Sequence, residues 1–380
     1  MEDAISVRMM ICVLLPDSEM TGIIYYSTQL YRHLPLQKEF IYIRGKKVSF
    51  PYYVKKVLMS RAKIFHIQLE PRFFKVLPEN IFMPLIAYIV KKVMKRRLVV
   101  TMHAIINPYD VPNLLQDDEL LSCLHKLLNY VAYPLYIAIN RLTLNLADIV
   151  IFHNYTVLNL ALRLFKIKPE KARVIPHGTI VDVRGRDIAK EANILCIGFL
   201  RSLRITNIFI IIEAFKILQS NFPQAKLHLL LMVPNERYNT NRLKNLLREL
   251  DKETQYNEKI KIIINPLEEI IEKCLEDADI GILPHQENTF ESSGVAWRLA
   301  GLGIPFIGKA IPKLVSDFKF LRNELIRDFS PNSIALALMR LLKDENYYSY
   351  VRNLLLNLSR ERSWERISEM HLTVYRGLLK

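Results

Sequence analysis

The stretch DADIGILPHQENTFESSGVAWRLAGLGIPFIGK, residues 277–309, decides the fold that the sequence predicts. Its apolar run, residues 280–283, is short enough for a buried parallel strand, and open α/β sheets bind ligands beyond the carboxyl ends of such strands. Ser292 and Ser293 are favourable N-cap residues for a helix that begins at Gly294. The unpaired amide groups at such a helix start attract phosphate, so this loop is a candidate phosphate site.

Short apolar runs alternate with longer helical patterns along the rest of the chain, which is typical of parallel sheets with crossover helices. Strands are expected in the first half at residues 9–15, 40–43, 64–67, 98–102, 149–152 and 173–175. Strands are expected in the second half at residues 194–197, 226–232, 260–264, 280–283 and 305–307. The polar run at residues 181–191 separates the two series and predicts an interdomain linker. The pattern therefore predicts two doubly wound α/β domains.

The length and amino-acid composition agree with two globular α/β domains and argue against a transmembrane protein. The chain has 380 residues, of which 51% are apolar and 24% charged, enough for two domains with large cores. Its scattered cysteines are expected to be buried thiols in a reducing, intracellular compartment: Cys12, Cys123, Cys196 and Cys274. The N-terminal apolar run lacks a small-residue cleavage site, so we interpret it as a first strand. No run reaches the ~18 apolar residues that span a bilayer, and a transmembrane enzyme is not expected.

The net charge of +15 is compatible with binding to a nucleic acid, to an anionic membrane surface or to an anionic substrate. Residues 81–90 are mostly apolar and lead into a basic cluster: Lys91, Lys92, Lys95, Arg96 and Arg97. This segment suits either a surface on anionic lipid headgroups or a core-packed helix with a solvated basic end. Residues 120–146 leave the same two interpretations open. Basic and aromatic residues are not interleaved as in single-strand grooves, so we expect no nucleic-acid partner.

Three segments carry a resemblance to a known family: VIPHGTIVD at residues 174–182, ILCIGFLRSLRITNIFIIIEAFKIL at residues 194–218, and residues 278–305. Together they resemble the retaining glycosyltransferase family four, whose members have the GT-B fold. VIPHGTIVD, residues 174–182, resembles the strand and His-Gly turn that end the first domain. ILCIGFLRSLRITNIFIIIEAFKIL, residues 194–218, resembles the first strand, basic loop and helix of the second domain. Residues 278–305 resemble the donor-sugar loop in its Ser-Gly variant. The resemblance implies an α/β, GT-B architecture with two Rossmann-like domains facing each other across a cleft.

The resemblance also implies domain boundaries. Residues 1–182 would form an acceptor-side Rossmann-like domain, and residues 183–358 the nucleotide-sugar-binding domain. Residues 359–380 resemble the terminal helix that crosses back onto the first domain.

In the family a Gly, an Arg and a Lys of the basic loop hold the donor diphosphate. Gly198 and Arg201 match that pattern, Arg204 stands where Lys is usual, and Ile205 replaces a Gly. Two guanidinium groups would stabilise the charge that develops on the departing diphosphate without a metal ion. The alternative is a pair of solvated loop arginines.

Three further residues match the family pattern one by one. Gly22 follows the first strand, where family members bring their backbone close to a phosphate or to the acceptor. The alternative is that Gly22 only forms a turn. His103 ends a strand where the family has a His facing the donor sugar, and the alternative is a structural His. The family has two glutamates separated by seven residues, of which the first reaches the donor sugar and the second holds the ribose. Glu291 matches the first. The position of the second falls on Arg298 or Leu299, and neither is a carboxylate, so ribose recognition differs from the family pattern or donor binding is weakened. Three other strand-end histidines are expected to be structural, with an acceptor-side role as a second option for the first: His66, His153 and His177.

The resemblance implies transfer of a sugar from a nucleotide diphosphate sugar to a hydroxyl acceptor, with retention and no required cofactor or metal. The expected acceptor is a glycan, a polysaccharide or a lipid-linked sugar. The protein is expected to be cytoplasmic, either free or bound peripherally at the inner face of the membrane. Inverting chemistry on the same fold stays open. A second function also stays open, namely a degenerate GT-B protein that serves as a non-catalytic partner of a glycan-synthesis complex.

Overall fold

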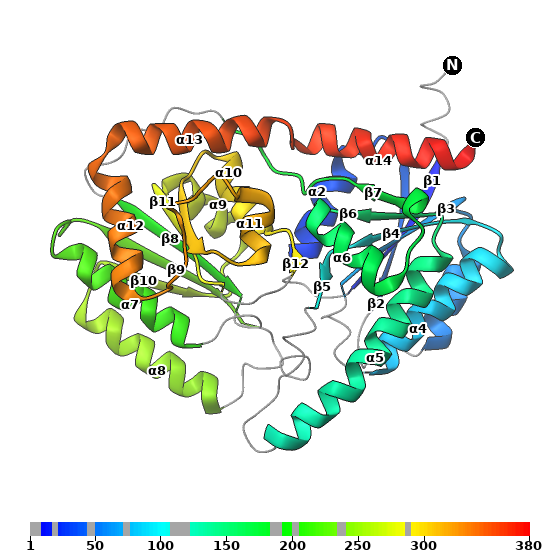
Figure 1. Ribbon diagram of the computed structural model, residues 1–380, viewed down its shortest axis with the longest axis horizontal. Helices are drawn as coiled ribbons and strands as arrows, with labels where there is room; N and C mark the ends of the chain where they lie inside the picture. Colours follow the sequence, from blue (N-terminus) through cyan, green and yellow to red (C-terminus); the bar gives the residue numbers. More distant parts are fainter. Residues whose placement is uncertain are drawn as a thin grey trace. The chain divides into compact units, whose positions relative to one another are not determined.

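The structure is a computed structural model that describes residues 9–16, 22–43, 50–70, 77–106, 122–182, 192–199, 205–233, 241–285 and 290–380. Its chain forms two compact units (Figure 1). Unit 1 contains residues 1–178, 288–292 and 364–380, and unit 2 contains residues 179–287 and 293–363. Each unit has its own parallel six-stranded sheet, with two apolar core clusters in unit 1 and one in unit 2. None of the described helices is long and apolar enough to cross a membrane.

Unit 1 alternates strands and helices from its first residues. Its elements are β1 Met10–Pro16, α2 Gly22–His33, β2 Gln37–Ile43, α3 Phe50–Met59, β3 Ile64–Leu69, α4 Leu77–Tyr88, η1 Ile89–Val93, β4 Arg97–Met102, β5 Ala104–Ile105, α5 Ser122–Leu146, β6 Ile149–Phe152, α6 Tyr155–Phe165, η4 Pro169–Lys171, β7 Ala172–Val174, β12 Phe290–Glu291 and α14 Trp364–Leu379. The strand order is β2-β1-β3-β4-β6-β7, and all these strands are parallel. The order reverses between β1 and β3, where α/β sheets bind ligands.

Two helical layers cover the sheet of unit 1, so its central strands β1, β3 and β4 are buried on both faces. Neighbouring residues of one strand alternate between the two cores, as Ile64 and Phe65 of β3 show. One core holds the inner faces of α3, α4, α5 and α6. The other holds α2 and the C-terminal helix α14, which pack against each other (Figure 1). The last helix of the chain is therefore part of the first unit's core.

Unit 2 repeats the same architecture. Its elements are β8 Asn193–Phe199, α7 Ile205–Gln219, β9 Lys226–Met232, α8 Asn241–Tyr256, β10 Ile260–Ile264, α9 Glu268–Asp277, β11 Ile280–Leu283, α10 Gly294–Gly301, β13 Phe306–Lys309, α11 Pro312–Phe318, β14 Leu325–Ile326, α12 Pro331–Lys343 and α13 Glu345–Arg360. The parallel sheet has the order β10-β9-β8-β11-β13-β14. Its order reverses between β8 and β11, so the candidate site of this unit lies beyond the carboxyl ends of these strands.

All eleven strands predicted from the sequence are present, with ends that differ by at most three residues. The predicted helix at Gly294 begins there, and it ends just before Gly303, whose φ of +66° only glycine adopts readily. Three two-residue strands, β5, β12 and β14, were not predicted. Residues 183–191 of the expected linker lie outside the described residues.

Candidate functional site

The site of unit 2 is organised around the neighbouring strands β8 and β11. Gly198 is buried near the end of β8, and the described chain resumes at Ile205, the first residue of α7. Arg201 and Arg204 belong to the intervening loop and lie outside the described residues. In the sequence they stand between the last residue of β8, Phe199, and the first residue of α7, Ile205.

Asn207, in the first turn of α7, ties this loop region to the donor-loop strand. Its side chain is buried, and Nδ2 donates a hydrogen bond to the carbonyl oxygen of Pro284 at 2.8 Å. Pro284 directly follows β11. The amide Oδ1 is also buried and has no hydrogen-bond partner among the described residues. Asn207 thus links the helix that follows the basic loop to the start of the donor loop, at the point where the strand order reverses.

The start of α10 has the capping geometry that the sequence predicted. Ser293 is the N-cap, and its Oγ accepts a hydrogen bond from the backbone N–H of Ala296 at 3.3 Å. Ser293 is buried, while Ser292 and Gly294 are partly exposed. The helix dipole and the first amide groups of α10 therefore form a phosphate-compatible helix start.

Glu291 belongs to unit 1, because its strand β12 pairs antiparallel with β5. In the register of that ladder Glu291 lies opposite Ala104, which directly follows His103. Glu291 is 5% exposed. The ladder therefore places Glu291 opposite the residue that directly follows His103, although Glu291 and His103 are 188 positions apart in the sequence. The family resemblance assigns both residues to the donor sugar.

His103 itself is part of a buried hydrogen-bond chain. Its Nε2 lies 2.7 Å from Gln68 Oε1, and its Nδ1 lies 3.2 Å from Nε2 of His153. Nδ1 of His153 donates to the carbonyl oxygen of Ile175 at 3.1 Å. Both ring nitrogens of His103 are thus engaged inside the protein.

Burial, and next the nearby histidines, lower the pKa of His103 well below its usual value, so the ring is neutral near pH 7. Because a carbonyl oxygen can only accept, His153 carries its proton on Nδ1 and receives the His103 Nδ1 proton at Nε2. His103 Nε2 then has a lone pair that faces Gln68 Oε1, which is also an acceptor. Two acceptors cannot bond each other, so either His103 carries a second proton or the Gln68 amide is rotated so that its NH2 group donates to His103 Nε2. Because the ring is neutral, the rotated amide is favoured.

His66 and His177 lie in the same buried region, together with aromatic side chains of α2 and α14. Nδ1 of His66 is 2.6 Å from the Tyr375 hydroxyl, and its Nε2 is 2.8 Å from Thr101 Oγ1. His177 Nδ1 donates to the Gly178 carbonyl oxygen at 2.7 Å. The same ring of Tyr26 packs near three histidines and one tryptophan, which are His103, His153, His177 and Trp364. These contacts support the structural interpretation of His66, His153 and His177.

Gly22 is the first residue of α2 and is exposed. A Cβ at this position would meet no described atom within 4 Å. Neither a packing contact nor a positive φ therefore requires glycine at this position. The open space is compatible with backbone approach by a ligand, as well as with a simple turn.

Arg298 stands near the position of the family's second glutamate. Its Nη2 lies 2.7 Å from Glu268 Oε1 and 2.6 Å from Glu272 Oε1, both on α9. This guanidinium is therefore paired with two carboxylates of its own unit. Among the described residues no cluster of His, Cys, Asp or Glu could hold a metal ion.

No protein-family model matches the sequence, and no curated protein matches it. Solved structures do match over nearly the whole chain. A glycosyltransferase from Rickettsia africae ESF-5 is 14% identical, with a TM-score of 0.62 over 98% of this chain and 99% of that one. A UDP-forming α,α-trehalose-phosphate synthase from Burkholderia xenovorans is 11% identical, with a TM-score of 0.66 over 98% and 100%. The fold is GT-B.

A pneumococcal O-GlcNAc transferase in complex with UDP and GlcNAc is 13% identical, with a TM-score of 0.55 over 86% of this chain and 59% of that one. At these identities the likeness concerns the GT-B fold alone. The two six-stranded parallel sheets of this chain, each with one reversal of strand order, agree with that fold.

Sequence reasoning missed Asn207 and the β5–β12 ladder. Asn207 is the one strongly polar residue in the run ITNIFIII at residues 205–212, which is the signal that could have indicated a buried hydrogen bond. The ladder has only two residues on each side, too short for any periodic pattern.

Proposed function

We propose that this protein is a glycosyltransferase that moves a sugar from a nucleotide diphosphate sugar to a hydroxyl group of an acceptor. The observation that carries the proposal is the pairing of β12 with β5, because it brings the backbone of Glu291 beside the residue that follows His103. The family resemblance assigns both residues to the donor sugar. The GT-B fold supports the proposal, since that fold is shared with a UDP-forming synthase and with a transferase in complex with UDP.

The proposed donor site uses the basic loop and the start of α10. Arg201 and Arg204 would face the diphosphate, with Gly198 allowing close approach of the backbone at the end of β8. The amide groups at Ser292, Ser293 and Gly294 would bind a second anionic group. Positive charge and oriented amides stabilise a departing diphosphate directly, so the proposed reaction requires no metal ion.

Glu291 is the proposed carboxylate at the donor sugar. For a retaining reaction, we propose attack of the acceptor hydroxyl on the same face from which the diphosphate leaves, with the leaving phosphate accepting the proton. Such a reaction requires positioning and charge stabilisation rather than a covalent intermediate. The proposed acceptor is a glycan, a polysaccharide or a lipid-linked sugar.

His103 has two ways to act in this scheme. With both ring nitrogens engaged by Gln68 and His153, it positions the segment on which β12 pairs. If Gln68 rotates away when donor binds, Nε2 of His103 becomes free to bond a sugar hydroxyl. The variant Gln68→Leu separates these roles, because it frees Nε2 of His103 and keeps the imidazole ring. If His103 only positions the segment, this variant should bind the donor more weakly. If His103 binds the donor directly, the variant should retain donor binding.

One observation favours the alternative of a non-catalytic GT-B protein. No carboxylate stands at the second glutamate position, and Arg298 there is paired with Glu268 and Glu272. Ribose would then have to be held by other groups. The alternative predicts weak or absent binding of nucleotide sugars and a protein partner instead.

The experiment is a release assay for nucleoside diphosphate, run with a panel of UDP, GDP, ADP and dTDP sugars in EDTA and in magnesium. The proposal predicts release from one donor that is independent of metal and is stimulated by a glycan or lipid-linked acceptor. The anomeric configuration of the product, read by NMR, then distinguishes retention from inversion. Release from no donor under any condition contradicts the proposal.

A further inference from the structure

A second surface of unit 1, formed by helices α3, α4 and α5, has a composition that glycosyl transfer does not explain. These helices lie on one face of the sheet and form one core with it. The rings of Phe50 and Phe82 stack at 4.0 Å between their centroids and join α3 to α4. Helix α4 packs along α5 (Figure 1). Their outer sides therefore form one continuous helical layer.

This layer carries more basic than acidic residues. Helices α3, η1 and α5 contain six Lys or Arg residues and no Asp or Glu, and α4 contains one Glu and no Lys or Arg. A field of one sign over a surface attracts an anionic partner at long range.

Exposed apolar side chains accompany these charges on α3. Tyr52, Leu58 and Met59 are 47%, 48% and 69% exposed. An open hollow of about 510 Å³ is lined on α3 by Phe50, Pro51, Val54, Lys55, Leu58 and Met59. Tyr88 of α4 and Val93 of η1 are also more than half exposed. Clustered apolar side chains beside basic ones are typical of helices that rest in a lipid headgroup region.

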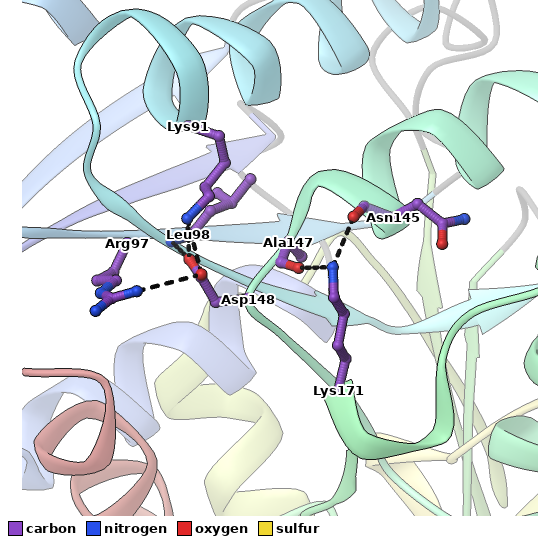
Figure 2. Close-up of polar contacts among 7 residues, drawn as sticks. All are labelled: Lys91, Arg97, Leu98, Asn145, Ala147, Asp148 and Lys171. Atoms are coloured by element: carbon purple, nitrogen blue, oxygen red, sulfur yellow. Dashed lines mark hydrogen bonds and ion pairs between the residues drawn. The ribbon is translucent and has the colours of Figure 1, made fainter.

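Part of the basic cluster at residues 91–97 has a structural role (Figure 2). Nζ of Lys91 lies 2.7 and 2.8 Å from the two carboxylate oxygens of Asp148, and Arg97 lies 3.7 Å from the same side chain. Nearby, Lys171 donates to the carbonyl oxygens of Asn145 and Ala147 at the end of α5. Lys91 is therefore paired within unit 1 and is not a freely solvated cation. The side chains of Lys92 and Lys95 are exposed.

We propose that the outer side of α3, with the exposed residues of α4 and η1, docks reversibly on the surface of an anionic lipid bilayer. Tyr52, Leu58 and Met59 would enter the headgroup region, and the lysines Lys55, Lys56 and Lys92 would contact anionic headgroups. Charge complementarity selects the occupant, because the surface has three exposed lysines, no acidic residue on α3 or η1, and exposed apolar side chains beside the lysines. The proposal does not depend on the glycosyl-transfer proposal.

The test is co-sedimentation of the full chain with vesicles of phosphatidylcholine alone and with 30% phosphatidylglycerol, without nucleotide. Two triple variants address the surface: Tyr52→Ser with Leu58→Ser and Met59→Ser, and Lys55→Gln with Lys56→Gln and Lys92→Gln. Matched controls change exposed residues of unit 2: Tyr256→Ser with Leu267→Ser and Leu336→Ser, and Lys244→Gln with Lys252→Gln and Lys343→Gln. Thermal unfolding verifies that each variant is folded.

We expect at least tenfold stronger partitioning to the anionic vesicles, weakened by salt. Each surface triple should lower that partitioning about tenfold, and each control triple should leave it near the wild-type value. Absent binding by the wild type, or an equal loss in surface and control variants, overturns the proposal. So does a concentration-dependent dimer that disappears only in the apolar surface triple, because the patch would then bind a second copy of this chain.

Discussion

The side-chain amide of Asn207 donates a hydrogen bond to the carbonyl oxygen of Pro284 at 2.8 Å, across 77 residues of sequence. It joins the first turn of α7 to the residue that follows β11. Both ends of this bond lie where the strand order of unit 2 reverses. If the basic loop and the donor loop together bind a nucleotide diphosphate, this bond sets their relative positions.

Asn207→Ala should weaken donor binding more than it weakens folding. The Pro284 carbonyl would lose its partner in a buried place, at a cost of about 1–3 kcal/mol. We expect the KM for the donor, or the Kd for its nucleotide, to rise about tenfold, while kcat changes less, because the residue positions loops and does not contact reacting atoms. Asn245→Ala, at an exposed position of α8, is the matched control. An unchanged KM together with a large loss of stability would give Asn207 a purely structural role.

Glu291→Gln should reduce turnover without unfolding the protein. The substitution keeps the side-chain shape and the backbone pairing with β5, and removes only the negative charge. We expect a loss of about tenfold to a thousandfold in kcat, the range typical of removing one electrostatic group at a reacting centre. Glu170→Gln, which is exposed on η4, is the control. Normal specific activity in a destabilised variant would instead show that Glu291 serves the β5–β12 ladder.

Stability should fall below about pH 6.5 because unit 1 buries neutral histidines. Burial lowers the pKa of His371 from 6.5 to about 4, although a hydrogen bond to the Ile367 carbonyl partly opposes this change. The unfolded chain therefore binds a proton before the folded one does. His371 alone should remove about 3 kcal/mol of unfolding free energy between pH 6.5 and about 4. The pKa values of His66 and His103 are lowered in the same direction.

Urea unfolding between pH 7.5 and 4.5 measures this dependence. His371→Gln should flatten the part of the profile that His371 causes. A wild-type profile that stays level from pH 7 to 5 would contradict a neutral, buried cluster.

Gly178 and Gly377 should respond in opposite ways to the same substitution. A Cβ at Gly178 would clash with the indole ring of Trp364, which is buried in unit 1. Gly178→Ala should therefore destabilise the protein by about 1–3 kcal/mol. Gly377 lies inside α14 with no atom within 4 Å of an added Cβ, so Gly377→Ala should stabilise by about 0.5–1 kcal/mol. Thermal or urea unfolding compares the pair, and equal effects would contradict the packing at Trp364.

The fold could be predicted from the sequence because each buried parallel strand is a short apolar run between polar or glycine-containing segments. The helix at Gly294 was predictable for a similar reason, since Ser293 and Gly303 supply local signals at both ends. β12 has no such signal. It forms because residues 290–291 meet β5, and a pairing between segments that far apart leaves no trace in local composition.

Side-chain partners were the part that sequence could not supply. Nothing in the sequence distinguishes Lys91 from the other four cations of residues 91–97, and only the structure shows its ion pair with Asp148. Arg298 likewise has its partners on another helix. In contrast, the proximity of His103 and His153 was within reach of the sequence, because both follow strands whose carboxyl ends share one edge of a parallel sheet.

The most direct test of the central claim is thermal unfolding of the purified chain with nucleoside diphosphates and nucleotide sugars, in EDTA and in magnesium, beside the double variant Arg201→Ala with Arg204→Ala. The glycosyltransferase account predicts that one nucleotide raises the Tm of the wild type equally with and without magnesium. The double variant should keep its own Tm and lose that increase. An increase of equal size in the double variant, or no increase with any nucleotide, would contradict the account.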